Sequence, residues 1–315
     1  MRTYFENFLK EYNYPEESWE VLRSAFDKLE KEEEFGLLLE TFFTDKPDFR
    51  SIMKAMCERI GLNLYTGYGV FYICLSKTTK EIYKNWGWTD DMFRRGMLDI
   101  MLQTCECYEV KKVWGLMGEG WMAGIVTGNV VTIGRLQFVA KPYAGEDKEV
   151  AGYKLTKGSP LITVHIPGSG ESFDEAVRKD AYDKAYEFYS KADGKNPCFS
   201  RWKDCDKAPD LNPCFFECQS WLVFPRNREI LNPNSNIISF MNEFKIIDTL
   251  VFGEDEMRLD LWRIFGYMED DEPLENFPEK TSLQRAYKKF LLDGNMPGQG
   301  IGVFVYDAKN KKILK

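Results

Sequence analysis

Residues 161–189, LITVHIPGSGESFDEAVRKDAYDKAYEFY, decide the fold of the second half of this chain. The first six residues alternate in a way that is typical of a strand with two different faces. One face carries Ile162, Val164 and Ile166. The other face carries Leu161, Thr163 and His165. A short glycine loop follows the strand, and an amphipathic helix follows the loop. The stretch therefore predicts a strand, a tight loop and a helix in direct succession.

The loop Gly168-Ser169-Gly170 has features of an anion site. Glycine lets another group approach the main chain closely, and a helix start presents unpaired N–H groups that attract phosphates and carboxylates. Ser172 and Glu175 fit a capping box, which predicts a helix from Phe173 to about Lys191. Three acidic residues at the same end oppose an anion: Glu171, Asp174 and Glu175. A capped helix without a ligand explains this pattern equally well, so both interpretations stay open here.

The composition narrows the class of protein. A chain of 315 residues suggests two domains, and 44% hydrophobic with 29% charged residues is ordinary for a globular protein. A net charge of -8 without a Lys/Arg stripe argues against nucleic acid as a partner. We see no apolar run of the ~20 residues that a membrane span needs, and no signal peptide. We therefore expect a cytoplasmic protein without a membrane partner.

The eight cysteines give no sign of a metal site. They form no C-x-x-C pair, and the gaps between the last four fit no common zinc knuckle. Reduced thiols are the ordinary state in the cytosol. We expect no bound metal, and we interpret Cys57 and Cys74 as small core residues.

The chain changes character near Gly115. Helical stripes fill the first third, where Pro15 marks one helix start, Thr89 is a candidate N-cap and Gly61 a candidate stop. The Met and aromatic stripes there predict helix packing. We place the domain boundary around residues 118–128 and predict a helical N-terminal domain of residues 1–122 and a second domain of residues 123–315.

The second domain alternates strands and helices. Its predicted strands include VVTIGRLQFVA, EVAGYKLTKGSPLITVHI, CFFECQSWLVF and EMRLDLWRIFGY. NREILNPNSNIISFMNEFKIID predicts a short helix and a strand, TSLQRAYKKFLLDG predicts a helix, and GIGVFVYDAKNKKILK predicts a closing hairpin. The fold class is therefore α+β, with a helical bundle followed by a mixed-sheet α/β domain.

A family resemblance rests on these same segments. HIPGSG fits the spacing of the Q/R-x-x-G-x-G/A signature of the GNAT superfamily of N-acyltransferases, with His165 in place of the usual Gln or Arg. IGRLQF, VHIPGSG, CQSWLVFP, LNPNSNIISFMNEF and TSLQRAYKKFLLDG occur in this order. Together they resemble a bacterial acyltransferase-like family that couples an N-terminal helical domain to a GNAT-like C-terminal domain.

The resemblance implies a binding site for acetyl-CoA or another acyl-CoA. It implies that residues 214–224 form a parallel neighbour of the 161–166 strand, and that the two strands diverge to leave a slot for pantetheine. The coenzyme-binding residues expected from it are Ile166, Gly168, Ser169, Gly170 and Asn236. Asn236 also has an ordinary role open to it, as do Asn234 and Ser235, because each can cap a helix.

Acyl transfer to an amine needs a base, donors for the oxyanion and an acid for the thiolate. His165, Glu217 and Ser220 are the catalytic candidates, although a histidine bonded to the next strand is the commoner arrangement. Cys218 is expected to be a buried thiol. Many GNAT enzymes place a tyrosine that acts as the general acid in the helix that NSNIISFMNEF would form. This segment contains no tyrosine.

Two arginines near the loop also have open interpretations. Arg135 fits either a structural ion pair or a clamp for a carboxylate or phosphate. Arg178, with Lys179, fits either a coenzyme phosphate contact or solvent exposure.

We therefore carry two functional hypotheses. The first is an acyl-CoA-dependent N-acyltransferase whose partner is a small-molecule or peptide amine. The alternative is a catalytically inactive GNAT-like scaffold or ligand-binding module, which the acidic helix end and the missing tyrosine favour. GSGESF lacks the third glycine of a dinucleotide-binding loop, which argues against that class. The acceptor and the oligomeric state are not determined by the sequence.

Overall fold

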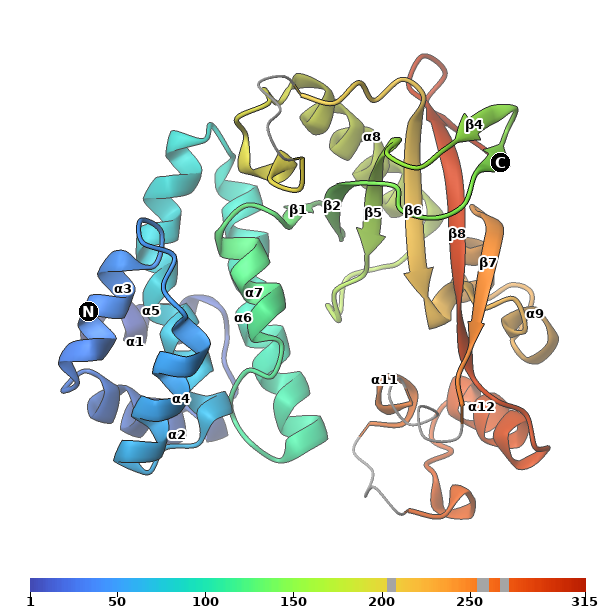
Figure 1. The fold of residues 1–315 in the computed structure, drawn as a ribbon. Helices are drawn as coiled ribbons and strands as arrows, with labels where there is room; N and C mark the ends of the chain where they lie inside the picture. The colour runs from blue at the N-terminus through green and yellow to red at the C-terminus, as the bar shows by residue number, and fades with distance from the viewer. Residues whose placement is uncertain (203–207, 254–260, 267–271) are drawn as a thin grey trace. The chain divides into compact units, whose positions relative to one another are not determined.

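The computed structural model describes residues 1–202, 208–253, 261–266 and 272–315. The chain folds into two compact units (Figure 1). The first unit contains Met1–Thr132 and Pro167–Ser169, and the second contains Ile133–Ile166 and Gly170–Lys315. Each unit is described by itself below.

The first unit is helical, as predicted. Within residues 1–132 the helices are α1 (Arg2–Glu11), α2 (Glu16–Leu29), α3 (Glu33–Thr41), α4 (Phe49–Ile60), α5 (Leu64–Asn85), α6 (Asp90–Lys111) and α7 (Glu119–Val126). The predicted end signals are present. Thr89 accepts a hydrogen bond from the backbone N–H of Met92 at 3.2 Å, and Gly61 ends α4 in the left-handed conformation.

Helix α5 lies at the centre of this unit. An uninterrupted run of buried residues, 66–76, covers all sides of the helix, and α2, α4 and α6 pack against it. Aromatic rings fill the space between α4 and α5, where the rings of Phe49 and Phe71 stack at 6.0 Å. Met97 and Ile100 of α6 are fully buried, so the predicted Met and aromatic stripes form a packed core.

The second unit is built on a mixed sheet, whose first strand begins in the last residues of the first unit. Its strands are β1 (Val131–Ile133), β2 (Leu136–Pro142), β5 (Pro160–His165), β6 (Cys214–Ser220), β7 (Lys245–Val251), β8 (Gly298–Asp307) and β9 (Lys312–Leu314). Their order is β1-β2-β5-β6-β8-β7, and β9 pairs with β8. Strands β5 and β6 are parallel, whereas β5 is antiparallel to β2 and β6 is antiparallel to β8. A separate hairpin consists of β3 (Lys148–Val150) and β4 (Tyr153–Leu155).

The helices of the second unit are short apart from two. They are α8 (Glu175–Lys191), α9 (Asn227–Ile230), α10 (Asn236–Met241), α11 (Trp262–Phe265) and α12 (Ser282–Leu292). Thr281 and Gln284 form a complete capping box at the start of α12. Tyr287 and Phe290 of α12 pack into a second apolar cluster that also contains Phe224.

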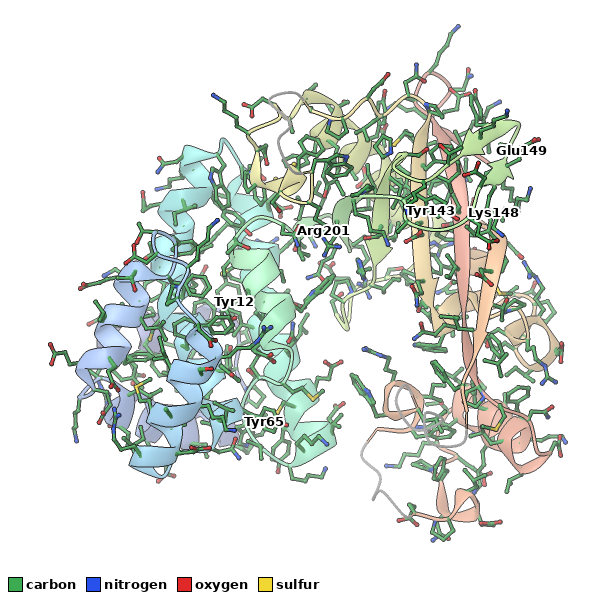
Figure 2. The ribbon with its side chains drawn as sticks, viewed as in Figure 1. Tyr12, Tyr65, Tyr143, Lys148, Glu149 and Arg201 are labelled. Atoms are coloured by element: carbon green, nitrogen blue, oxygen red, sulfur yellow. The ribbon has the colours of Figure 1, made fainter. Side chains whose placement is uncertain are left out.

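The two faces of the sheet have different covers. On one face Tyr182 of α8 lies over Phe216 and Phe304, at ring-centroid distances of 5.5 and 5.1 Å. On the other face the β3–β4 hairpin packs Val150 and Leu155 against the sheet. Figure 2 labels Tyr143, Lys148 and Glu149 in this region. The side chain of Lys245 donates to the carbonyl of Glu149 at 2.7 Å, which ties β7 to the hairpin.

Two predicted strands need correction. The segment CFFECQSWLVF leaves the extended conformation after Ser220, because the Ser220 hydroxyl accepts from the N–H of Leu222 and starts a 3-10 turn over Trp221–Val223. The predicted strand EMRLDLWRIFGY is wrong at Trp262–Phe265, which form α11, and the rest lies largely outside the described residues. A short apolar run cannot by itself separate strand from helix.

Candidate functional site

Strands β5 and β6 stop pairing before either of them ends. Their parallel register covers Leu161–Phe215, Ile162–Phe216 and Thr163–Glu217. Strand β5 continues to His165, and β6 continues to Ser220 while still paired with β8 on its other side. The two strands therefore diverge after the Thr163–Glu217 pair, which is the arrangement expected from the sequence.

The glycines of the following loop are not required by the chain itself. Gly168 and Gly170 are exposed, and a Cβ atom built on either one would meet no atom within 4 Å. Neither residue has the left-handed backbone conformation that favours glycine. A left-handed turn or a close internal contact therefore does not explain them.

Alternate amides of this loop are not used by the protein. Within the described residues, the N–H groups of Gly168, Gly170, Ser172 and Asp174 donate to no protein acceptor. The side chains of the neighbouring acids consequently do not occupy them. These four donors, followed by the first turn of α8, can together receive an anionic group.

The start of α8 differs from the sequence prediction. The helix begins at Glu175 instead of Phe173, and Asp174 takes the N-cap position without a side-chain capping bond. The predicted Ser172–Glu175 capping box is wrong because the carboxylate of Glu175 forms an ion pair with Lys179, at 2.5 Å, one turn further along the helix.

Arg135 and Arg178 hold the segment between the loop and the helix. Both side chains are buried. Arg135 donates from Nε to the carbonyl of Glu171 at 3.3 Å, and Arg178 donates from Nη1 to the carbonyl of Phe173. Both guanidinium groups also lie against the Phe173 ring, at 5.6 and 4.9 Å from its centroid. The burial of Arg178 differs from the solvent exposure considered for it from sequence.

A buried ion pair fixes Arg178. Its Nε and Nη2 donate to Oε1 of Glu243 at 2.8 and 2.6 Å, and Nη2 also donates to the hydroxyl of Ser239 at 2.9 Å. The second oxygen of Glu243 accepts from the hydroxyl of Tyr182 at 2.8 Å. Burial raises the pKa of Glu243, and the bonds from Arg178 and Tyr182 oppose that rise. Helices α8 and α10 are thereby joined beneath the loop.

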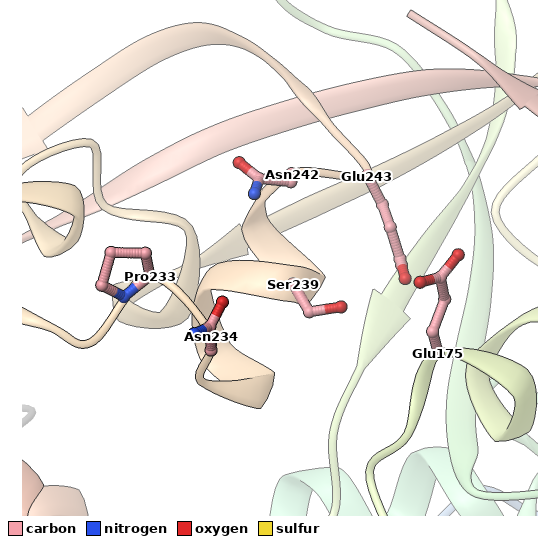
Figure 3. A pocket seen from close by; sticks show the side chains of 6 residues that line it. All are labelled: Glu175, Pro233, Asn234, Ser239, Asn242 and Glu243. Carbon is pink, nitrogen blue, oxygen red and sulfur yellow. The ribbon is translucent and has the colours of Figure 1, made fainter.

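A polar pocket opens beside this ion pair (Figure 3). Its volume is about 400 Å³. The carboxylates of Glu175 and Glu243 face one another across it, and Ser239 points into it (Figure 3). Pro233, Asn234 and Asn242 complete the lining. The pocket adjoins the first turn of α8, so a ligand on the loop amides has room beside it.

His165 is held in one tautomer by Thr163. The Thr163 hydroxyl donates to the carbonyl of Val139 at 3.1 Å, so it accepts at its second contact, the Nε2 of His165 at 3.0 Å. His165 consequently carries hydrogen on Nε2. Burial, followed by the charges of Lys141 and Arg201, lowers the pKa of His165 to about 4. An imidazole with this pKa is neutral at pH 7 and is a weak base.

The sheet brings Glu217 to the face that carries His165. Glu217 is the parallel partner of Thr163, and alternation along β5 places His165 on the same face. The carboxylate of Glu217 is buried and lies 2.6 Å from the Nζ of Lys141, which extends from β2. Ser220 falls on the opposite face by the same alternation. The predicted candidates His165 and Glu217 therefore share one face of the sheet, whereas Ser220 lies on the other.

The remaining candidates have ordinary surroundings. Asn236 is exposed in the first turn of α10, and Ser235 is the actual N-cap, accepting from the N–H of Ile238 at 3.3 Å. Cys218 is buried, and burial raises its pKa, as expected of an inert thiol. Cys205 lies outside the described residues. In the described part of the chain, no helix has the length and apolar character to cross a membrane.

The comparisons with known proteins agree with this architecture. The family model of the GNAT-like C-terminal domain matches residues 130–304, which is more than half of the chain. This chain belongs to that family. The resemblance inferred from its motifs, and the fold class of a helical region followed by a GNAT-like mixed-sheet domain, are thus confirmed.

Solved structures share the fold over nearly the whole chain. An acyltransferase in complex with decanoyl-CoA and teicoplanin is similar with a TM-score of 0.69 and 15% identity, over 95% of this chain and 87% of that chain. An acyltransferase mutant in complex with octanoyl-CoA gives a TM-score of 0.68 at 15% identity, over 95% and 86%. An acyltransferase in complex with CoA and 10C-teicoplanin gives 0.67 at 15% identity, over 95% and 86%. No curated protein matches the chain.

The pair Arg178 and Glu243 in this GNAT-like domain was missed from sequence. The two residues are 65 positions apart, and Arg178 has the helical spacing of an ordinary solvated residue. The local sequence carried no clear signal for this pair, because Glu243 lies between Asn242 and Phe244, in a segment that also contains Lys245.

Proposed function

We propose that this member of the GNAT-like family is an acyl-CoA-dependent acyltransferase that acts on an amine. The observation that carries the proposal is the combination of unused loop amides with two strands that part directly before them. The pyrophosphate of an acyl-CoA accepts hydrogen bonds from the four loop amides, those of Gly168, Gly170, Ser172 and Asp174. Pantetheine then lies between the diverging ends of β5 and β6 and pairs with their backbone groups.

The catalytic assignment follows from the His165 face. Glu217 is the base, because it is a carboxylate at the point where the strands part, and Lys141 fixes its orientation. The amine nitrogen attacks the thioester carbonyl, the C–S bond breaks, and the ammonium proton passes to Glu217, directly or through water. The proton then leaves with the CoA thiolate. His165 is not assigned as the base, because its low pKa makes it a poor proton acceptor.

The acyl and amine classes are suggested by the structural neighbours. The similar structures are complexes with decanoyl-CoA, octanoyl-CoA or CoA, and two of them also contain teicoplanin or 10C-teicoplanin. A medium-chain acyl group is therefore worth testing beside acetyl. An amine-bearing glycopeptide is a reasonable first acceptor, together with simple peptide amines.

Ligand binding to the full chain tests the proposal. Calorimetry and thermal unfolding are measured with CoA, acetyl-CoA, octanoyl-CoA and decanoyl-CoA. Binding to the native state raises the melting temperature with ligand concentration. Mass spectrometry then follows transfer of the acyl group to the panel of amines. An intact folded protein that neither binds nor is stabilised by any of the four would refute the proposal.

The alternative is a non-catalytic binding module, which the acidic residues Glu171 and Glu175 near the loop and the low pKa of His165 favour. The same experiment separates the two functions. Binding of acyl-CoA without transfer to any amine in the panel supports the module.

A further inference from the structure

We propose that Arg135 and Arg178 are positioning residues that aim the phosphate-binding amides. This inference rests on the proposed function, because it assumes that the loop receives the pyrophosphate of acyl-CoA. It assigns to two buried arginines a role in substrate binding, although neither one touches the substrate.

The geometry of the peptide group carries the inference. A trans peptide is planar, so its C=O and the N–H of the next residue point in opposite directions. Arg135 holds the carbonyl of Glu171, which directs the N–H of Ser172 away from that guanidinium. Arg178 holds the carbonyl of Phe173, which directs the N–H of Asp174 away from its own guanidinium. Both amides are without a protein acceptor among the described residues.

The two arginines act on one rigid segment. The Phe173 ring lies against both guanidinium groups, so the residue between the two held carbonyls is also fixed. Ser172 and Asp174 have exposed side chains and contribute little packing of their own. The bonds from the two arginines therefore support the direction of these two amides.

The guanidinium of Arg178 donates hydrogen bonds to several acceptors at once. Its hydrogen bonds use Nε, Nη1 and Nη2, and they connect Phe173, Ser239 and Glu243. A guanidinium can hold several acceptors in a fixed fork, whereas a lysine ammonium is a point charge on a flexible stem. Replacing Arg178 by lysine therefore keeps the buried charge beside Glu243 and removes the directed bond to the loop.

The test compares ligands with and without the pyrophosphate. The variants Arg178→Lys and Arg135→Lys are assayed for steady-state transfer from an acyl-CoA and from the matching acyl-pantetheine, and for binding of CoA. Lys184→Gln is the matched control, because Lys184 is an exposed residue of α8 whose ammonium pairs with Asp180 of the same helix. Melting temperatures report on folding of every variant.

We expect KM for acyl-CoA and the Kd of CoA to rise about tenfold in each arginine variant. A tenfold change is the order of magnitude expected when one charge-assisted contact is lost. The value of kcat, and kcat/KM for acyl-pantetheine, should stay within about twofold of the parent, and Lys184→Gln should behave like the parent throughout. A purely structural role would lower kcat/KM for both donors in parallel, and that result overturns the inference.

Either arginine variant can test the prediction if the other one does not fold. Should Arg178→Lys fail to fold, Arg135→Lys still tests the same prediction through the Glu171 carbonyl. Parent protein that binds CoA, combined with folded variants that bind it equally well, refutes the positioning role alone. Parent protein that binds no CoA refutes the proposed function instead.

Discussion

Thr163 and Glu217 are the last residues that β5 and β6 pair with one another. Beyond this pair β5 leads to His165 and the glycine loop, and β6 leads to a 3-10 turn after Ser220. The register of β5 with β6 in the described residues ends at this pair. We propose that the acyl-CoA enters there, with Glu217 on one strand and the loop amides following the other.

Replacing Glu217 tests the assignment of the base. We expect Glu217→Gln to lower kcat by about 10²- to 10³-fold, the range for loss of a general base, and to leave CoA affinity unchanged. Steady-state kinetics and calorimetry give the two quantities. The double variant with Lys141→Gln is the control, because it removes the charge that Glu217 balances at 2.6 Å. Recovery of activity in the double variant would mean that Glu217 only neutralises Lys141.

The depressed pKa of His165 predicts a pH dependence of stability. The folded-state pKa is about 4, whereas an ordinary histidine has about 6.5. As the pH falls from 6.5 towards 4, the unfolded chain takes up a proton that the native protein does not, so the free energy of unfolding decreases. Protonation of this histidine in the unfolded chain should lower the free energy of unfolding by about 2 kcal/mol between pH 7 and pH 5.

Urea unfolding of the parent and of His165→Asn at these two pH values measures that dependence. Other titrating groups contribute to both proteins, so the difference between them isolates His165. We expect the parent to lose more stability than the variant on going to pH 5. Equal losses in the two proteins would show that the pKa of His165 is not depressed.

Asn227 joins the turn after β6 to helix α12. Its buried amide donates to the carbonyls of Trp221 and Leu222, at 2.7 and 3.3 Å, and its oxygen accepts from the hydroxyl of Tyr287. We expect Asn227→Ala to lower the free energy of unfolding by about 2–4 kcal/mol, because several buried polar groups lose their partner.

Chemical denaturation of three variants checks this network. Tyr287→Phe should lower the free energy of unfolding less than Asn227→Ala does, since it removes one of the three hydrogen bonds of the Asn227 side chain. The double variant should cost less than the sum of the two single changes, because the side chains share a bond. Strict additivity would argue against the coupling of Asn227 and Tyr287.

Much of the second unit was predictable because local pattern and tertiary structure agree there. Alternation in residues 161–166 identified β5 and its two faces, and the sheet register then placed His165 and Glu217 on one face. The hairpin of β8 and β9 followed from its strand pattern and the turn near Asn310. The strands themselves depend on neighbours within a few residues of the chain, and only the register between them needs the folded sheet.

The features that were not predictable depend on which partner a charged side chain takes. Arg178 is buried because Glu243, 65 residues later, comes to lie against it. The start of α8 moved to Glu175 because its carboxylate pairs with Lys179 instead of capping the helix. In both cases the pattern allowed two arrangements of similar local energy, and side-chain pairing in the folded protein decided between them.

The most direct measurement is calorimetric binding of CoA to a variant with both loop glycines replaced by valine. Gly168→Val with Gly170→Val should fold normally, because both positions are open and neither has a left-handed backbone. Gly36→Ala, at an equally open and exposed glycine of α3, is the control. We predict that the parent and Gly36→Ala bind CoA, and that the double valine variant binds it at least about tenfold more weakly, since the side chains keep the pyrophosphate from the amides. Equal affinity for CoA in a folded double valine variant would contradict the role of these amides.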